Sequence, residues 1–157
     1  GGSNLIGMIH EFLDEPEIIK IGVEAAETAA LSNGTPGIMQ GMKTYMLQTD
    51  DGSKSLGGSS LGAGIQYFSV GPQHAFLKDQ GVVKYTSATD KEILEAYKLI
   101  ASTEGICSAL EPMAGAAELI KQAKNKPKDY LICLNLCGTG EKDLNTIQEH
   151  IGKDFEW

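Results

Sequence analysis

The first four residues are the part of the chain best suited to holding a charged ligand. Gly1 and Gly2 allow a tight backbone turn, and Ser3 and Asn4 are preferred residues at the start of a helix. A turn that opens a helix presents unpaired backbone N–H groups and the positive end of the helix dipole. We therefore expect this turn to bind an anion such as a phosphate. The residues alone leave open a second reading, in which the first three are a remnant of cloning and Asn4 is a simple cap.

A second candidate for ligand binding lies near the other end of the chain. Residues 130–136 are apolar and predict the strongest buried strand, and residues 137–143 follow as a loop that contains Gly138 and Gly140. Open α/β sheets bind their ligands at the carboxyl ends of strands. This loop is therefore expected to border a binding site.

Residues 52–71 form an unusual stretch with six glycines and five serines. The stretch also carries two adjacent aromatic residues, Tyr67 and Phe68, which a flexible linker would have little reason to hold. We interpret it as a loop that passes close to a ligand.

Strands and helices alternate around these loops. Strands are predicted at 18–23, 82–86 and 130–136. Helices are predicted after the N-terminal turn, after Gly71-Pro72, after the Thr89–Glu92 capping box, at 114–123 and at the C-terminal end. Residues 24–37 are interpreted as a small and polar turn region, and 41–47 as a covered segment. The predicted class is α/β, with an open, mainly parallel twisted sheet flanked by helices.

Composition limits the possible functions. The 157 residues, 41% of them hydrophobic, suffice for the core of one domain. The net charge is −8 and all 13 basic residues are Lys, which argues against nucleic-acid binding. Three cysteines without CxxC spacing suggest neither a disulfide framework nor a zinc site, so a reducing cytoplasm is expected. The sequence has no apolar stretch that predicts a membrane span and no signal-peptide pattern, and it starts within a functional turn, as a fragment would.

Several short motifs follow one another along the chain. They are Gly-Gly-Ser-Asn at 1–4, Gly-Thr-Pro-Gly at 34–37, Gly-Met-Lys at 41–43, Ser-Val-Gly-Pro-Gln-His-Ala at 69–75, Thr-Glu-Gly-Ile at 103–106, Ala-Leu-Glu at 109–111 and Asn-Leu-Cys-Gly-Thr-Gly-Glu-Lys-Asp at 135–143. In this order they resemble the beta subunits of tryptophan synthase, and the resemblance covers essentially the whole chain. The resemblance makes a cloning remnant at residues 1–3 the weaker reading.

The resemblance implies a place in a larger enzyme. Residues 1–157 correspond to the C-terminal domain of a fold-type II pyridoxal 5′-phosphate enzyme, without the N-terminal domain that carries the Schiff-base lysine. In the intact protein the implied reaction joins L-serine and indole to give L-tryptophan and water. The chain alone is expected to be inactive.

The resemblance also implies roles for individual residues. The residues implied to bind the cofactor are Gly1, Gly2, Ser3, Asn4, Gly64 and Cys137, the first four around the phosphate and Cys137 beside the pyridine nitrogen. Glu111 is implied to be the catalytic carboxylate that assists proton transfer. The backbone carbonyls of Tyr67 and Ser69 are implied to bind a monovalent cation, sodium or potassium.

The sequence departs from the family at several positions. Gln66 replaces an Asp that helps to close the active site, Cys137 replaces a Ser, and Thr139 replaces an Arg. Gln40 lies where an aromatic residue usually lines the indole tunnel, and residues 112–115 differ from the family's Ser-Ser-His-Ala. The segment between residues 24 and 34 is also shorter than in the family.

Two other classes of function stay open. A serine or threonine dehydratase, or a relative of cysteine synthase, shares the fold and the glycine turn. A noncatalytic paralogue would only pair with another subunit, and the departures at 66, 137 and 139 favour it. The family itself implies an alpha-subunit partner and a beta–beta homodimer.

Overall fold

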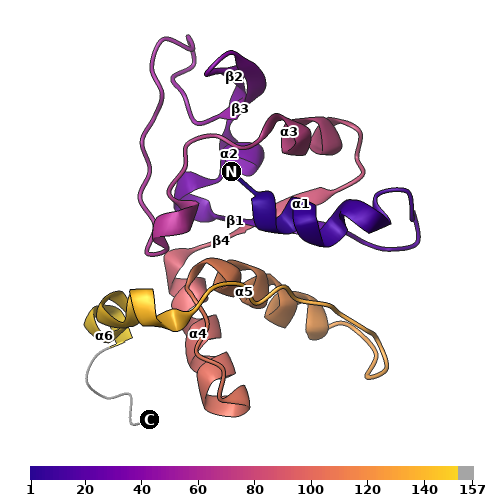
Figure 1. Cartoon of the computed structure of the whole chain (residues 1–157), viewed down its shortest axis with the longest axis vertical. Coiled ribbons are helices and arrows are strands. Elements are labelled where there is room, and N and C mark those ends of the chain that lie inside the picture. Colours follow the sequence, from indigo (N-terminus) through magenta and orange to yellow (C-terminus); the bar gives the residue numbers. More distant parts are fainter. Residues whose placement is uncertain (152–157) are drawn as a thin grey trace.

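The computed structural model describes residues 1–151 and has the expected α/β class. Strand β1 (Ile21–Ala25) pairs in parallel with β4 (Lys84–Ala88), and Val23 lies opposite Thr86. A second pair, β2 (Thr35–Met39) and β3 (Met42–Met46), is an antiparallel hairpin. The parallel pair is the centre around which the helices are arranged (Figure 1).

Helices surround the parallel pair. They are α1 (Ser3–Ile9), α2 (Ala30–Asn33), α3 (Pro72–Asp79), α4 (Asp90–Glu104), α5 (Glu111–Ala123) and α6 (Leu144–Ile151). Of these, α2 and α5 pack directly against the pair. Short 3-10 turns occur at His10–Phe12, Ala26–Thr28, Ala63–Ile65 and Gly140–Asp143. Figure 1 shows α4 and α5 on one side of β1 and β4, and α2, α3 and the hairpin on the other.

The main core lies between the parallel pair and helices α4 and α5. Ile93, Tyr97, Leu110 and Met113 are fully buried there. Helix α4 begins with the predicted capping box, in which Thr89 Oγ1 accepts a hydrogen bond from the Glu92 amide at 3.3 Å. The start of α4 is therefore confirmed, and the apolar face of the helix packs mainly against α5, which in turn packs on the parallel pair.

Both strands of the parallel pair begin later than predicted. The prediction of 18–23 was wrong at its start, because Ile18 and Ile19 are 43% and 55% exposed and lie in the irregular segment before β1. The ammonium of Lys20 donates to the carbonyls of Glu15 and Ile18 and holds that segment together. The strand predicted at 82–86 likewise begins later, at Lys84, and ends at Ala88. Each apolar run therefore covers the residues just before the strand and only the first part of the strand itself.

The β2–β3 hairpin was not predicted from the sequence. Its two-residue turn is Gln40-Gly41, with φ angles of 48° and 80°, the left-handed conformation that a tight hairpin of this kind requires. A Gln-Gly pair is a weaker hairpin signal than Asn-Gly, and Pro36 and Gly37 in the first strand argue against a strand.

The prediction of a buried strand at 130–136 was wrong. Within the described residues this segment forms no strand, and Leu131 is 94% exposed. A strand exists only through hydrogen bonds to a neighbouring strand, and neither described sheet includes this segment. It runs back along α5 instead (Figure 1), with Leu134 and Leu136 packed against the main core.

Candidate active site

A cavity of about 530 Å³ lies between the N-terminal turn, β1, the loop before α3 and the segment that follows α5. The residues that the sequence analysis assigned to cofactor binding, catalysis or the cation site all contribute to its lining: Gly1, Gly2, Ser3, Asn4, Gly64, Tyr67, Ser69, Glu111 and Cys137. These residues come from four separate parts of the chain, so the fold brings them together. Their individual roles stay predictions.

The N-terminal turn is held by its carbonyl groups. The carbonyl of Gly1 accepts a hydrogen bond from the Gly71 amide at 3.1 Å. The carbonyl of Gly2 accepts one from the Ile6 amide at 3.2 Å and another from the His74 ring at 2.7 Å. Within residues 1–151 the amides of Gly2, Ser3 and Asn4 donate no hydrogen bond. The turn therefore offers unpaired donors, as an anion site requires.

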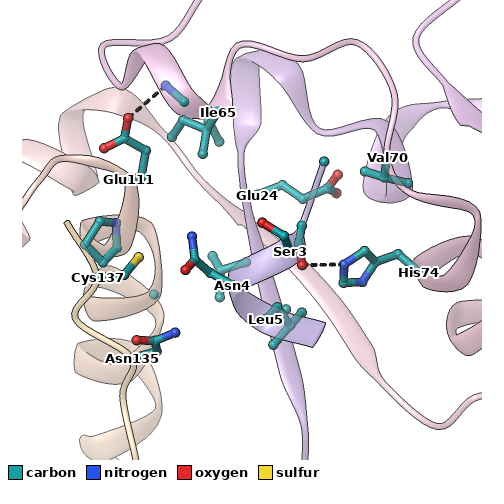
Figure 2. A pocket seen from close by; sticks show the side chains of 18 of the residues that line it. Ser3, Asn4, Leu5, Glu24, Ile65, Val70, His74, Glu111, Asn135 and Cys137 are labelled. Carbon is teal, nitrogen blue, oxygen red and sulfur yellow. Dashed lines mark hydrogen bonds between the residues drawn. The ribbon is translucent and has the colours of Figure 1, made fainter. Parts of the chain in front are cut away.

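Glu111 begins helix α5 and lies against the loop that contains Gly64. Its Oε1 accepts a hydrogen bond from the Gly64 amide at 2.8 Å, which Figure 2 marks, and another from the Lys142 ammonium at 2.8 Å. Its Oε2 is buried and has no partner within the described residues. Burial raises the pKa of Glu111, but the Lys142 ammonium and the backbone amides outweigh it, so the pKa lies below its usual value. The residue is a carboxylate with one oxygen available to accept a proton.

Lys142 is a site residue to which sequence reasoning gave no role. Its ammonium bonds Asp143 as well as Glu111, each at 2.8 Å. Asp143 in turn accepts the Leu110 amide at 2.8 Å, which fixes the residue just before α5. The Gly-Glu-Lys-Asp run at 140–143 was the available signal, because it places a cation directly after the glycine loop.

The glycine loop is fixed next to the cavity. Ser108 Oγ donates to the Cys137 carbonyl at 3.3 Å, and the Gly140 amide donates to the Cys107 carbonyl at 3.2 Å. Thr139 pairs with Ser108 as an isolated bridge, and a Cβ on Gly138 would come within 3.0 Å of the Ala109 methyl group. In the view of Figure 2, Ser3 and Asn4 lie between His74 on one side and Cys137 and Asn135 on the other.

The loop at 62–70 forms another wall. The side-chain amide of Gln66 donates to the Ser60 carbonyl at 2.5 Å. Ser69 is buried and pairs with Met46, whereas Tyr67 is 58% exposed. Within residues 1–151 no group of three or more His, Cys, Asp or Glu residues is arranged to hold a metal ion, and the backbone cation site stays a prediction. Gln40 lies in the hairpin turn and is not among the residues that line the cavity.

Glu24, His74 and Tyr85 also line the cavity, although sequence reasoning assigned them no role. Both carboxylate oxygens of Glu24 accept amides from the start of α2, at 2.9 Å from Leu31 and Ser32. Burial raises the pKa of Glu24. His74 belongs to the motif at 69–75 and to a predicted helix, but a histidine in such a position gives no signal of its partner.

The cavity fits a phosphorylated aromatic cofactor. Its turn has unpaired amides, and a Cβ on Gly1 would meet no atom within 4 Å, so there is open space at the turn. The orphaned Oε2 of Glu111 and the thiol of Cys137 belong to the opposite wall. Anion donors on one side and acid–base groups on the other match the two ends of pyridoxal 5′-phosphate.

The chain is similar to curated bacterial proteins over nearly its whole length. It is 45% identical over 164 aligned residues to the tryptophan synthase beta chain of Ruegeria sp. (strain TM1040), covering 99% of this chain and 39% of that protein. The chain is homologous to tryptophan synthase beta chains. The beta chain of Dinoroseobacter shibae is also 45% identical, with 99% of this chain and 40% of that protein covered. The chain thus spans about two-fifths of the length of these beta chains. No family model matches the chain.

Solved structures show the same fold at low sequence identity. O-ureido-L-serine synthase with O-ureido-L-serine bound has a TM-score of 0.60 at 16% identity, covering 94% of this chain and 38% of that one. A second structure of that synthase has a TM-score of 0.58 at 17% identity, covering 96% and 40%. The homology to beta chains and these neighbours place the fold among fold-type II pyridoxal 5′-phosphate enzymes. None of the helices within residues 1–151 combines the length and apolar character needed to cross a membrane.

Proposed function

We propose that this chain is the C-terminal part of a tryptophan synthase beta chain that joins L-serine and indole to give L-tryptophan and water. The main support is the 45% identity to beta chains over 99% of the chain. The convergence of all the assigned residues on one cavity gives further support. The Schiff-base lysine would come from the N-terminal half of the intact protein.

In this proposal each wall of the cavity has its own task. The Gly2, Ser3 and Asn4 amides hold the cofactor phosphate, and Cys137 lies beside the pyridine nitrogen. When bound, pyridoxal 5′-phosphate supplies the electron sink that stabilises negative charge at the α-carbon of the amino acid. A neutral thiol leaves the pyridine nitrogen largely unprotonated, which restrains that sink and favours β-replacement over transamination.

Glu111 is proposed to move protons at the reacting carbon. Its Oε2 has no partner within the described residues, whereas Oε1 is held by Gly64 and Lys142. One oxygen thus fixes the side chain and the other is available to assist loss of the serine hydroxyl and addition of indole. The Lys142 ammonium keeps the carboxylate ionised and ready to accept a proton.

The remaining assignments of the intact protein are also proposals. We propose an alpha subunit as partner, a beta–beta homodimer, a cytoplasmic location, and a sodium or potassium ion held by the Tyr67 and Ser69 carbonyls. Ser69 is buried beside the cavity, which supports a cation site formed by backbone carbonyls there. Such a site tolerates a change of side chain, because the ligands belong to the backbone.

The test compares the 157-residue chain with the full polypeptide. The chain alone should make no tryptophan from serine and indole, and addition of the N-terminal half should restore cofactor absorbance and tryptophan formation. In the restored protein, Glu111→Ala should lower the rate by about 10² to 10⁴. Activity of the lone chain would overturn the division of the site between two halves.

The noncatalytic paralogue is kept as a second candidate because three family positions have changed, at Gln66, Cys137 and Thr139. A full polypeptide that binds the cofactor but never makes tryptophan would favour it, and Gln66→Asp would be the first reversion to try. In an active protein, Cys137→Ser should preserve or improve β-replacement. Cys137→Asp should protonate the pyridine nitrogen and shift products toward transamination.

A further inference from the structure

His74 is a buried histidine with both ring nitrogens in hydrogen bonds. It lies in the first turn of α3, and only 2% of the residue is exposed. Its Nε2 is 2.7 Å from the Gly2 carbonyl oxygen, and its Nδ1 is 2.9 Å from the Tyr85 hydroxyl (Figure 2 marks the first of these bonds). A carbonyl oxygen can only accept, so Nε2 carries the hydrogen.

The neutral ring sets the direction of the whole chain of bonds. With its hydrogen on Nε2, a neutral imidazole accepts at Nδ1, so the Tyr85 hydroxyl donates to it. Burial lowers the pKa of His74 and raises that of Tyr85, which favours the neutral form of both groups. Tyr85 therefore donates to His74, and His74 donates to Gly2.

This bond fixes the orientation of a peptide plane in the N-terminal turn. In a trans peptide the C=O of one residue and the N–H of the next point in opposite directions, and no described peptide bond is cis. Helix α3 and its preceding residue bind the carbonyl of Gly1 through Gly71 and that of Gly2 through His74. The amides of Gly2 and Ser3 consequently point away from α3, and both residues line the cavity.

The fit between the ring and the turn is close. Gly2 has a φ of 91°, and a Cβ added there would lie 2.1 Å from His74 Nε2. No side chain caps α1 within the described residues, so the turn lacks the usual local means of fixing its conformation. The histidine supplies that function from a different helix.

We propose that His74 is a positioning residue that binds the Gly2 carbonyl through Nε2–H and thereby aims the Gly2 and Ser3 amides at the phosphate of the cofactor. The inference rests on the proposed function, since the phosphate belongs to the proposed pyridoxal 5′-phosphate. His74 itself does not touch the phosphate in this arrangement. Its effect on binding should therefore depend on the presence of the phosphate.

Two substitutions separate the two ring nitrogens. In His74→Gln the side-chain amide reaches the position of Nε2 and keeps a donor for Gly2. In His74→Asn the amide reaches only the position of Nδ1 and loses that donor. The full polypeptide without cofactor would be titrated with pyridoxal 5′-phosphate and with pyridoxal, which lacks the phosphate, by fluorescence quenching. The dissociation constant for pyridoxal divided by that for pyridoxal 5′-phosphate measures the contribution of the phosphate to binding.

His74→Asn should reduce this ratio roughly fivefold to tenfold, the effect of one lost hydrogen bond, with pyridoxal binding unchanged. His74→Gln should stay within about threefold of the wild type. Equal losses for both variants, or equal losses for both probes, would instead show a general structural role and overturn the proposal.

Tyr85→Phe keeps the inference testable if the Asn variant does not fold. It removes the donor to Nδ1 while leaving His74 in place. The affinity for pyridoxal 5′-phosphate should therefore fall by about twofold to fivefold, and the affinity for pyridoxal should not change. An unchanged ratio in this variant would count against the proposed chain of bonds. A wild-type protein that binds neither probe would remove the proposed function itself, whereas wild-type binding with unchanged ratios in every variant would remove only the role of His74.

Discussion

Two walls of the cavity are held in opposite ways. The N-terminal turn is bound by Gly71 and His74, two residues that lie about seventy positions later in the sequence. The wall at residues 133–135 belongs to the extended segment after α5, residues 130–136, which has no strand partner within the described residues. Both walls are rich in groups that can bind a ligand, but only the first has its backbone orientation fixed by neighbours.

The difference shows what each kind of wall needs. A turn can be fixed by two or three polar contacts from a helix, because few dihedral angles have to be set. An extended segment needs a ladder of backbone bonds along its length, and packing of Leu134 and Leu136 on the core fixes only one of its faces. We therefore expect the first wall to be more rigid than the second.

The largest expected effect is on amide hydrogen exchange in the 157-residue chain. The hydrogen-bonded amides of β1 and β4 should exchange at least about a thousandfold more slowly than those of residues 131–136, since only the former require opening of the core. Hydrogen exchange followed by NMR measures this directly. Slow exchange at 131–136 would mean that the segment has found a partner strand, and its dependence on protein concentration would show whether that partner is a second copy.

Substitution of leucines should show the same contrast in stability. Leu110 is fully buried in the main core, so Leu110→Ala should lower the free energy of unfolding by about 2–5 kcal/mol. Leu131→Ala is the matched control, because Leu131 is 94% exposed and its loss should change stability by less than about 0.5 kcal/mol. Urea denaturation measures both. A comparable cost at the two positions would show that the extended segment is packed in solution.

Much of this contrast could not be predicted from the sequence. The capping box at Thr89, the proline start of α3 and the described helices other than α2 could be predicted, because each depends on residues close together in the chain. The interpretation of residues 24–37 as a turn region was wrong, because they include the end of β1, helix α2 and the start of β2. The strand at 130–136 could not be judged, since its apolar pattern says that it would be buried in a sheet but not whether a neighbouring strand is present.

The candidate site was predicted in the same uneven manner. The residues assigned to cofactor binding, catalysis and the cation site were identified from glycine-rich loops and from the resemblance to a family, and all of them line one cavity. The residues that fix them, His74 and Lys142, were missed because their partners Gly2 and Glu111 are 72 and 31 positions away. Such pairings appear only in the folded structure.

The turn itself can be tested with a pair of glycines. Gly2→Ala should destabilise the protein by at least about 1–2 kcal/mol, because alanine disfavours a φ of 91° and its methyl group would collide with the His74 ring. Gly1→Ala should leave stability nearly unchanged, since a Cβ there meets no atom within 4 Å. Thermal unfolding of the two variants makes the comparison. Equal stability would mean that the turn adjusts freely and that His74 does not hold it.

The smallest expected effect concerns the pH dependence of the Glu111 contacts on the opposite wall. The pKa of Glu111 in the folded state lies below its usual value, so its contribution to stability is present above the unfolded pKa of about 4.3 and is lost as pH falls through the folded pKa. The contribution should be at most about 1 kcal/mol, because the Lys142 side chain is 47% exposed and water screens the pair. Glu111→Gln keeps the shape and an acceptor for Gly64 but cannot titrate, so between about pH 5 and pH 3 its free energy of unfolding should fall less steeply than that of the wild type. Denaturant titrations at several pH values measure the two slopes. Identical slopes would show that the pKa of Glu111 is the same in the folded and unfolded states, so that Lys142 and the backbone amides do not favour its ionised form.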